Sequence, residues 1–350
     1  MSNHLLEVKN LRTHFASGGG IVQAVRGVDI HVDAGEFLGI VGESGCGKSV
    51  TMMSIMRLLA ENAAVKADSL VFDGRDILSQ SEKTMRSIRG NEIGMIFQDP
   101  MTSLNPLFTV GNQMMEHLRL HKNMTKEQAK ARAIEMLTTV GINEPEKRLK
   151  QYPHEMSGGM RQRVMIAIAM CCNPKILIAD EPTTALDVTI QAQIMELMED
   201  LKNNFSTAVI LITHDLGVIA RSCSRVIVMY GGLIMEEGSV EQIFYEPAHP
   251  YTEGLLRSVP RHGIEEEDSE SQDKGGEAQT VERQREKLIP IPGSPPDLMN
   301  PPAGCPFAAR CEKAMKICKM APAQLTEVGE GHRSACWLLH SQAPGKDRER

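Results

Sequence analysis

The chain has 350 residues, which is enough for one large domain or two ordinary domains with a sizeable core. Apolar residues make up 41% and charged residues 24%, as in ordinary soluble proteins, and the net charge of -7 argues against a nucleic-acid-binding protein, which normally carries a basic face. Residues 1–10 lack a charged-then-apolar signal pattern and no run of about 18 apolar residues occurs, so we expect neither a secretory signal nor a membrane span. Eight cysteines without a signal peptide indicate a reducing cytosol, where clustered cysteines more often bind metal than form disulfides.

Two N-terminal segments, residues 5–15 and 22–32, alternate apolar and polar side chains. This alternation is typical of an antiparallel sheet with one exposed face, and we expect that sheet to pack beside a main one. Short apolar runs bounded by Gly, Asp or polar turns predict strands of the main sheet at residues 37–41, 94–97, 176–179, 208–213 and 226–230. Their alternation with helical patterns over residues 1–260 predicts an α/β core.

The pattern turns helical between about residues 99 and 172. Helices are expected at 110–121, 125–140 and 159–172. Thr125 is a candidate N-cap for the second of these helices, and Gly141 is a candidate C-cap. We therefore expect a helical subdomain inserted between two strands of the core.

The C-terminal part of the chain has a different composition. Residues 261–288 are rich in Glu, Asp, Ser, Gln and Lys, which predicts a flexible acidic linker. Residues 289–340 are rich in Pro and Cys, and seven prolines between 290 and 306 predict an irregular extension that begins as an extended arm. No internal repeat is evident, so one copy of the core is expected.

Residues 42–49 match the phosphate-loop pattern G-x-x-x-x-G-K-[ST], between an apolar strand and a helical pattern as the motif requires. The glycines let backbone N–H groups surround phosphates, and the helix N-terminus favours their negative charge. Lys48 is expected to reach the β- and γ-phosphates of ATP, and the Ser49 hydroxyl to bind Mg²⁺. The expected nucleotide contacts are Gly42, Glu43, Ser44, Gly45, Cys46, Gly47, Lys48, Ser49 and Val50.

Two carboxylates, Asp180 and Glu181, follow the strand expected at 176–179. Ligands of open α/β sheets bind at the carboxyl ends of the strands, which places these acids beside the phosphate loop. We expect Asp180 to hold Mg²⁺ directly or through water, and Glu181 to orient or deprotonate the attacking water. The alternative, two surface acids at a strand end, does not explain their pairing with a phosphate loop.

A Ser-Gly-Gly segment within residues 156–162 lies about 20 residues before these acids, and here the chain resembles the ABC ATPases, whose signature motif it matches. A serine can cap the helix that follows, and two glycines let backbone amides approach an anion. The resemblance implies that this motif contacts the γ-phosphate bound by a partner chain, in a head-to-tail dimer with two composite sites. The residues concerned are Ser157, Gly158, Gly159 and Gln162.

Four further positions match the same family. Gln98 resembles the glutamine that senses Mg²⁺ and the attacking water, and His214 resembles the switch histidine that contacts the γ-phosphate, although a lone histidine at a strand end is often structural. Asp187 resembles the aspartate at the dimer interface. Phe15 occupies the place of an aromatic residue against adenine, but it is equally suited to a core. With Lys48 and Glu181 intact, the resemblance implies active ATP hydrolysis.

Within that family the chain resembles the ATP-binding subunits of oligopeptide or dipeptide importers, through residues 97–106, 249–252, 292–296 and 304–311. The resemblance implies a second ATPase chain, two transmembrane permease subunits, an extracytoplasmic substrate-binding protein, and a peripheral place on the cytoplasmic face of a bacterial membrane. Importers of nickel, haem or oligosaccharides use similar subunits and remain alternatives. A soluble ABC ATPase or a phosphate-loop kinase fits less well, because the chain has one ATPase unit and carries the signature segment.

Four cysteines of the tail, Cys305, Cys311, Cys318 and Cys336, have a spacing that fits no short zinc-knuckle pattern. Four thiolates can hold a [4Fe–4S] cluster or a zinc ion. Related subunits are thought to carry an iron–sulfur cluster here, so the resemblance favours the cluster. Four reduced thiols packed under the Pro-rich arm remain the alternative.

Overall fold

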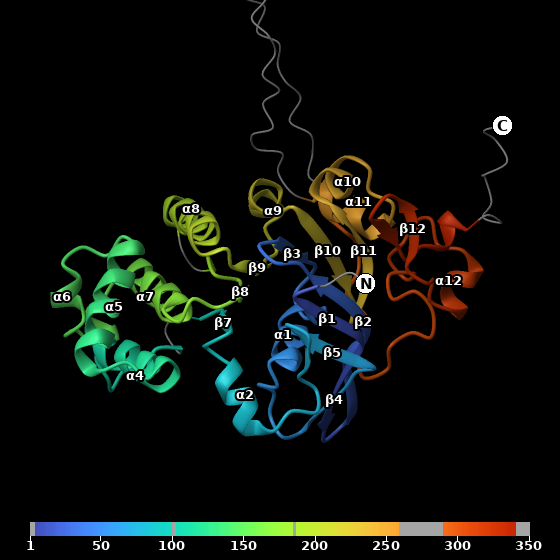
Figure 1. Ribbon diagram of the computed structural model, residues 1–350. Helices are drawn as coiled ribbons and strands as arrows, with labels where there is room; N and C mark the ends of the chain where they lie inside the picture. The colour runs from blue at the N-terminus through green and yellow to red at the C-terminus, as the bar shows by residue number, and fades with distance from the viewer. Residues whose placement is uncertain (1–3, 100–102, 185–186, 259–289, 341–350) are drawn as a thin grey trace, which may run out of the picture.

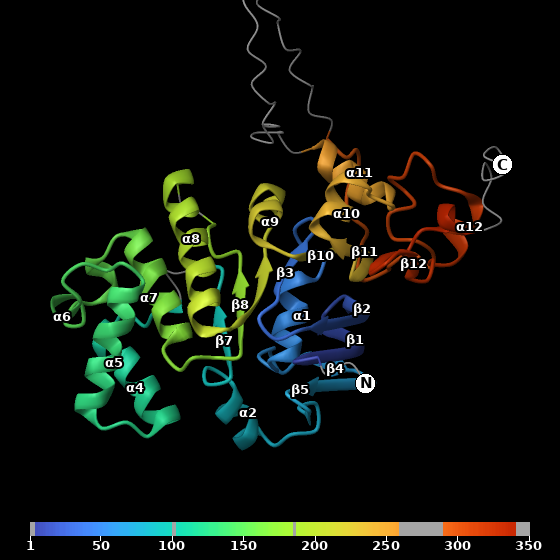
Figure 2. The same ribbon diagram turned by 45° about the horizontal axis from the view of Figure 1, so that its top comes forward.

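The computed structural model describes residues 4–99, 103–184, 187–258 and 290–340, and its strands form two sheets (Figures 1 and 2). The smaller sheet is antiparallel, with the strand order β2-β1-β5-β6 and with β4 paired to β1. Buried residues such as Leu6, Val8 and Leu11 alternate with less buried ones along β1, so one face of this sheet packs inward, as the sequence predicts. Its strands are β1 (Leu6–Ser17), β2 (Gly20–Val32), β4 (Ala63–Lys66), β5 (Ser69–Phe72) and β6 (Arg75–Asp76).

The larger sheet has the strand order β12-β13-β11-β10-β3-β9-β8-β7. The pairs from β10 to β7 are all parallel, so the carboxyl ends of these strands share one edge of the sheet. All five predicted strands of the main sheet are confirmed, with ends that differ by at most one residue. They are β3 (Phe37–Val41), β7 (Ile93–Ile96), β8 (Ile176–Asp180), β9 (Ala208–Ile212) and β10 (Arg225–Tyr230), and β11 (Leu233–Ser239) follows antiparallel to β10.

The central strands contribute to two apolar cores. Every residue of β3, β8 and β9 is buried, which explains why these strands are continuous apolar runs and not alternating ones. Leu38 and Ile40 of β3 pack into one core with the antiparallel sheet, whereas Phe37 and Val41 pack into the other core with the helices. An apolar core therefore covers each face of the large sheet.

The helical subdomain lies beyond β7, at one end of the large sheet (Figures 1 and 2). Thr125 and Gln128 form a capping box at the start of α5, and Gly141, with φ +73°, follows its C-cap residue Val140. Both predicted caps thus lie where the second helix begins and ends. The elements here are α4 (Val110–Lys122), α5 (Lys126–Thr139), α6 (Pro145–Arg148), η1 (Pro153–Glu155) and α7 (Gly158–Met170).

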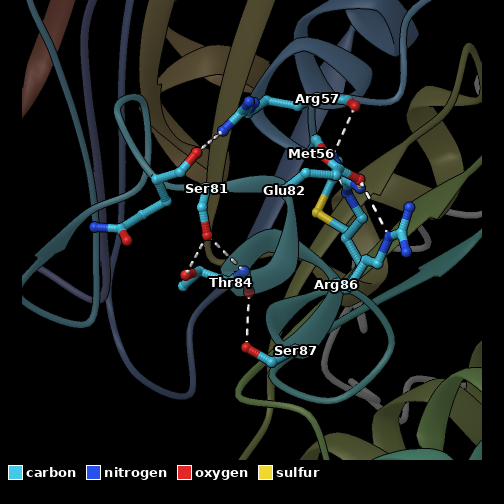
Figure 3. A network of polar contacts seen from close by, with 9 residues as sticks. Met56, Arg57, Ser81, Glu82, Thr84, Arg86 and Ser87 are labelled. Carbon is cyan, nitrogen blue, oxygen red and sulfur yellow. Dashed lines mark hydrogen bonds and ion pairs between the residues drawn. The ribbon is translucent and has the colours of Figure 1, made fainter.

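A short helix, α2 (Glu82–Ile88), lies in the chain between β6 and β7, and Figure 3 shows polar contacts of its residues and of their neighbours. The Ser81 hydroxyl accepts a hydrogen bond from the N–H of Thr84 at 3.2 Å and caps the helix. Arg57, just after α1 (Lys48–Ile55), donates to the carbonyl of Gln80 at 2.6 Å. The bond from Arg57 ties the segment before α2 to the residue that follows α1, and β7 leads on to Gln98.

The remaining helices lie around the large sheet, and side chains cap the N-termini of several of them. Asp187, Asp215 and Ser239 cap the helices that follow them through side-chain oxygens that accept backbone N–H bonds. The capped helices are α8 (Val188–Phe205), α9 (Leu216–Ser222) and α10 (Val240–Tyr245), and α11 (Pro250–Arg257) follows them. Among the described residues, none of the helices is long and apolar enough to cross a membrane.

The C-terminal extension returns to the core and widens the large sheet. β13 (His332–Ser334) pairs with β11, and β12 (Thr326–Gly329) pairs with β13. His332 and Ser334 are buried on either side of Arg333, and His332 Nε2 lies 2.7 Å from Glu236 Oε1 on β11. The extension predicted as irregular therefore contains two strands, which are too short to show a period in the sequence, together with α12 (Lys316–Met320) and η2 (Trp337–Leu339). The predicted linker at 261–288 lies outside the described residues.

Candidate nucleotide-binding site

The phosphate loop, residues 42–49, connects β3 to α1 at the carboxyl edge of the large sheet. Gly42 and Gly47 have φ values of +148° and +107°. A Cβ atom on Gly42 would lie 2.1 Å from the Met229 carbonyl oxygen, and one on Gly47 would lie 2.6 Å from that of Ala24. Both glycines are thus required for the backbone path and for its close packing on β10 and β2.

Lys48 is buried, with 5% of its surface exposed, and its ammonium group lies under the loop. Its Nζ donates to the carbonyl oxygens of Gly42 at 2.7 Å and Glu43 at 3.1 Å. Cys46 Sγ lies 3.8 Å from the same nitrogen, and burial raises the pKa of that thiol. The lysine is therefore held inside the loop, where it can pair with phosphate oxygens, while Ser44 and Gly45 at the tip of the loop are exposed.

Ser49 and Asp180 meet at the base of this loop. The Ser49 hydroxyl donates to Asp180 Oδ1 at 2.8 Å, although the two residues are 131 positions apart in the chain. Asp180 is 2% exposed, and desolvation raises the pKa of its carboxyl group. A hydroxyl and a carboxylate are the hard oxygen ligands that Mg²⁺ prefers, so the pair fits the predicted metal site.

Glu181 lies among the side chains of two predicted site residues and one that was not predicted. Its Oε2 accepts hydrogen bonds from Gln98 Nε2 and Thr184 Oγ1, each at 3.0 Å, and its Oε1 lies 3.6 Å from His214 Nδ1. The Glu181 backbone has φ +46°, a region that non-glycine residues seldom adopt. The structure thus brings Gln98, Glu181 and His214 together at the ends of three neighbouring strands, β7, β8 and β9.

Thr184 is the residue at this cluster that the sequence analysis missed. It lies three residues after Glu181, and its N–H also bonds to the Glu181 carbonyl at 3.1 Å, so the two residues share one tight turn. The Pro-Thr-Thr sequence after the two acids was the available signal, because a threonine at this spacing can hydrogen-bond back to the preceding carboxylate.

The Ser-Gly-Gly segment caps α7. The Ser157 hydroxyl accepts a hydrogen bond from the N–H of Met160 at 3.3 Å, and both Ser157 and Gly158 are exposed. Gln162 is buried and donates to the carbonyl of Pro182 at 2.5 Å, which ties α7 to the segment after Glu181. Within the described part of the chain, no hydrogen bond joins Ser157 to the phosphate loop of the same chain.

The two remaining predicted contacts are Asp187 and Phe15. Asp187 caps α8, since its Oδ1 accepts from the N–H of Ile190 at 2.9 Å, and its neighbours 185 and 186 lie outside the described residues. Phe15 is half-buried on β1, where it pairs with Val22 on β2. The proposed contacts of Phe15 with adenine and of Asp187 with a partner remain predictions.

The tail cysteines Cys305, Cys311, Cys318 and Cys336 line one cavity, together with His249 and Phe307. The N–H of Cys305 donates to the carbonyl of Cys318 at 2.7 Å, which closes the loop that carries them. Burial raises the pKa of Cys305 and of Cys336 to about 11 each. Chain folding therefore brings together four thiols that are widely spaced in the sequence.

Comparisons with known proteins agree with this geometry. A family model for "ABC transporter" matches residues 25–184, and one for "Oligopeptide/dipeptide transporter, C-terminal region" matches residues 235–285 and 277–318. The chain is 54% identical, over 97% of its length and 90% of the relative, to the oligopeptide transport ATP-binding protein OppD of Bacillus subtilis. It is 52% identical to the dipeptide transport ATP-binding protein DppD of Bacillus subtilis, over 97% of the chain and 96% of that protein.

Solved structures match the core. The dimeric ATP-binding cassette MJ0796 bound to ADP and Pi has a TM-score of 0.60 and 30% identity, and covers 67% of this chain and 98% of its own. CbiO1 of Clostridium perfringens, part of an ABC transporter complex, has a TM-score of 0.58 and 27% identity, covering 70% and 92%. The motifs, the fold and these matches agree that the chain belongs to the ABC transporter family, as an ATP-hydrolysing subunit of its oligopeptide and dipeptide transporters.

Proposed function

We propose that this chain hydrolyses ATP in a head-to-tail dimer with a second ATPase subunit, and that each phosphate loop is completed by the signature segment of the other chain. The observation that carries the proposal is the meeting of Gln98, Glu181 and His214 beside Ser49 and Asp180. The exposed cap at Ser157, with the free N–H groups of a helix N-terminus behind it, supports the exchange of signature segments. A dimeric, post-hydrolysis form of the MJ0796 cassette gives further support.

The roles of the residues follow from their positions. Glu181 orients the attacking water and takes up its proton, while Gln98 and His214 hold the carboxylate and contact the water and the γ-phosphate. Lys48 and the amides of residues 42–49 stabilise the charge that develops on the phosphates. Mg²⁺, held by Ser49 and Asp180, would supply further neutralisation of that charge. Asp187 would face the partner chain, and Phe15 would pack against adenine.

Bound ATP would therefore hold the two subunits together, because both of them contact its γ-phosphate. Loss of the γ-phosphate removes the shared contact, so the dimer opens and the helical subdomain moves. We infer that this movement reaches two transmembrane permease subunits through the surface between Gln98 and the helical subdomain, on the cytoplasmic face of the membrane. An extracytoplasmic substrate-binding protein would deliver the peptide, which this chain never touches.

The transported substrate is tested by uptake. Cells that lack this chain should lose import of labelled di- or oligopeptides, and the wild-type gene should restore it while Glu181→Gln should not. Uptake of nickel, haem and oligosaccharides should stay unchanged in the same cells. Unchanged peptide import, with loss of one of the other substrates, would overturn the peptide assignment and leave the ATPase assignment in place.

All four tail cysteines, Cys305, Cys311, Cys318 and Cys336, line one cavity, where four thiolates can hold a [4Fe–4S] cluster or a zinc ion. The resemblance to related subunits favours the cluster. We propose that these cysteines hold a [4Fe–4S] cluster, which would crosslink the tail through its bonds to the cysteine sulfurs.

Anaerobically purified protein should contain about four iron and four sulfide ions per chain if the cysteines bind such a cluster. Cys318→Ser should lose most of the iron, whereas Cys223→Ser, which changes a partly buried thiol outside the tail, should keep it. Normally folded protein free of iron and of sulfide would overturn the cluster, and one equivalent of zinc in its place would assign the site to zinc.

A further inference from the structure

Glu43, the second residue of the phosphate loop, is held from three sides. Its N–H donates to the Tyr251 hydroxyl at 2.9 Å, and its carbonyl accepts from Lys48 Nζ at 3.1 Å. Its carboxylate Oε2 accepts from Arg310 Nη1 at 2.7 Å. Tyr251 lies in the first turn of α11 and Arg310 belongs to the C-terminal extension, so two elements from outside the nucleotide-binding motif fix Glu43 at the start of the loop.

The guanidinium of Arg310 is held by the extension and by the sheet. Its Nε donates to the carbonyl of Pro292 at 2.8 Å, and its Nη2 donates to that of Ile291 at 3.1 Å. Nη1 reaches the hydroxyl of Tyr230, at the end of β10, at 2.9 Å. Only 7% of the Arg310 side chain is exposed. Its planar guanidinium, which bonds to several partners, is therefore held in one orientation.

The ion pair between Arg310 and Glu43 affects the binding of a ligand that carries several negative charges. An uncompensated Glu43 carboxylate beside the loop would repel the phosphates of ATP, and in a partly buried place this repulsion is weakly screened. Arg310 cancels that charge and also fixes the loop before the ligand arrives, and pre-organisation of this kind improves affinity.

We propose that Arg310 is a positioning residue of the nucleotide site, through which the C-terminal extension sets the affinity of the phosphate loop for ATP. The inference rests on the proposed function, because it needs the loop at residues 42–49 to bind ATP. The hydrogen bonds of Arg310 go to Glu43, Tyr230, Pro292 and Ile291. It acts through Glu43, so its loss should alter ATP binding more than the chemical step.

The chain supplies matched controls for a merely structural role. Lys313 pairs with Glu253 on α11 at 2.9 Å, and Arg333 donates to Glu237 on β11 at 2.6 Å. Both pairs tie the extension to the core, as Arg310 does, but neither reaches the phosphate loop. A variant that only loosens the extension should therefore resemble Lys313→Met or Arg333→Met.

The test measures the Kd of the full-length chain for a fluorescent ATP analogue in the presence of Mg²⁺. Arg310→Met should raise Kd about tenfold, Arg310→Lys should restore part of the affinity, and Lys313→Met and Arg333→Met should stay within about twofold of wild type. In the assembled transporter, Arg310→Met should raise the KM for ATP by a similar factor, while kcat changes less than about twofold.

Glu43→Gln in the Arg310→Met background should recover part of the lost affinity, because it removes the unpaired carboxylate. An unchanged Kd in Arg310→Met, or an equal loss in the two control variants, would overturn the inference while leaving the ATPase assignment intact. Failure of the wild-type chain to bind the analogue would instead overturn the proposed function itself.

Discussion

Replacing Glu181 by glutamine should lower ATP turnover by about a hundredfold or more while leaving ATP binding intact. Glutamine has the same shape and can keep the hydrogen bonds with Gln98 and Thr184, but it cannot accept the proton of the attacking water. ATP that is bound and not cleaved keeps both subunits in contact with its γ-phosphate. We therefore expect a stable closed dimer that forms only when ATP is added.

Steady-state phosphate release and size-exclusion chromatography with ATP measure the two effects. Glu199→Gln is a suitable control, because Glu199 lies on α8 and accepts a hydrogen bond from Ser222 away from the loop. The control should hydrolyse ATP at the wild-type rate and should not be trapped. Wild-type turnover in the Glu181→Gln variant would show that Glu181 takes no part in the chemical step.

Replacing Ser157 by aspartate should stop hydrolysis without weakening ATP binding by the same chain. Aspartate caps a helix as well as serine does, so α7 should keep its N-terminus and its position. The new carboxylate would, however, lie where the partner's γ-phosphate is expected, and like charges at that distance repel. We expect turnover of the assembled transporter to fall at least about tenfold, because composite sites lose the partner's contribution.

The positions of the candidate catalytic residues could be predicted because each follows a buried strand. Asp180, Glu181, Gln98 and His214 come directly after apolar runs, and parallel strands deliver their carboxyl ends to one edge. The phosphate loop could be predicted because its motif is continuous in the sequence. The pairing of Ser49 with Asp180 follows from the same topology.

The tail could not be predicted to the same depth. The strands of residues 326–329 and 332–334 gain their stability from β11, and a segment of three or four residues has too few side chains to show a period. The contacts of Arg310 and Tyr251 with Glu43 join residues more than 200 positions apart, and only the fold brings them together. Thr184 was missed because it supports Glu181 from within a turn.

The central claim is that the ATP bound by one chain is completed by the signature segment of another. The most direct test purifies the assembled transporter with Ser157→Asp on this chain and measures ATP hydrolysis, alongside the Kd for ATP of the isolated variant. The account predicts an unchanged Kd and a turnover reduced at least about tenfold. Wild-type turnover, or a lost affinity of the isolated chain for ATP, would contradict it.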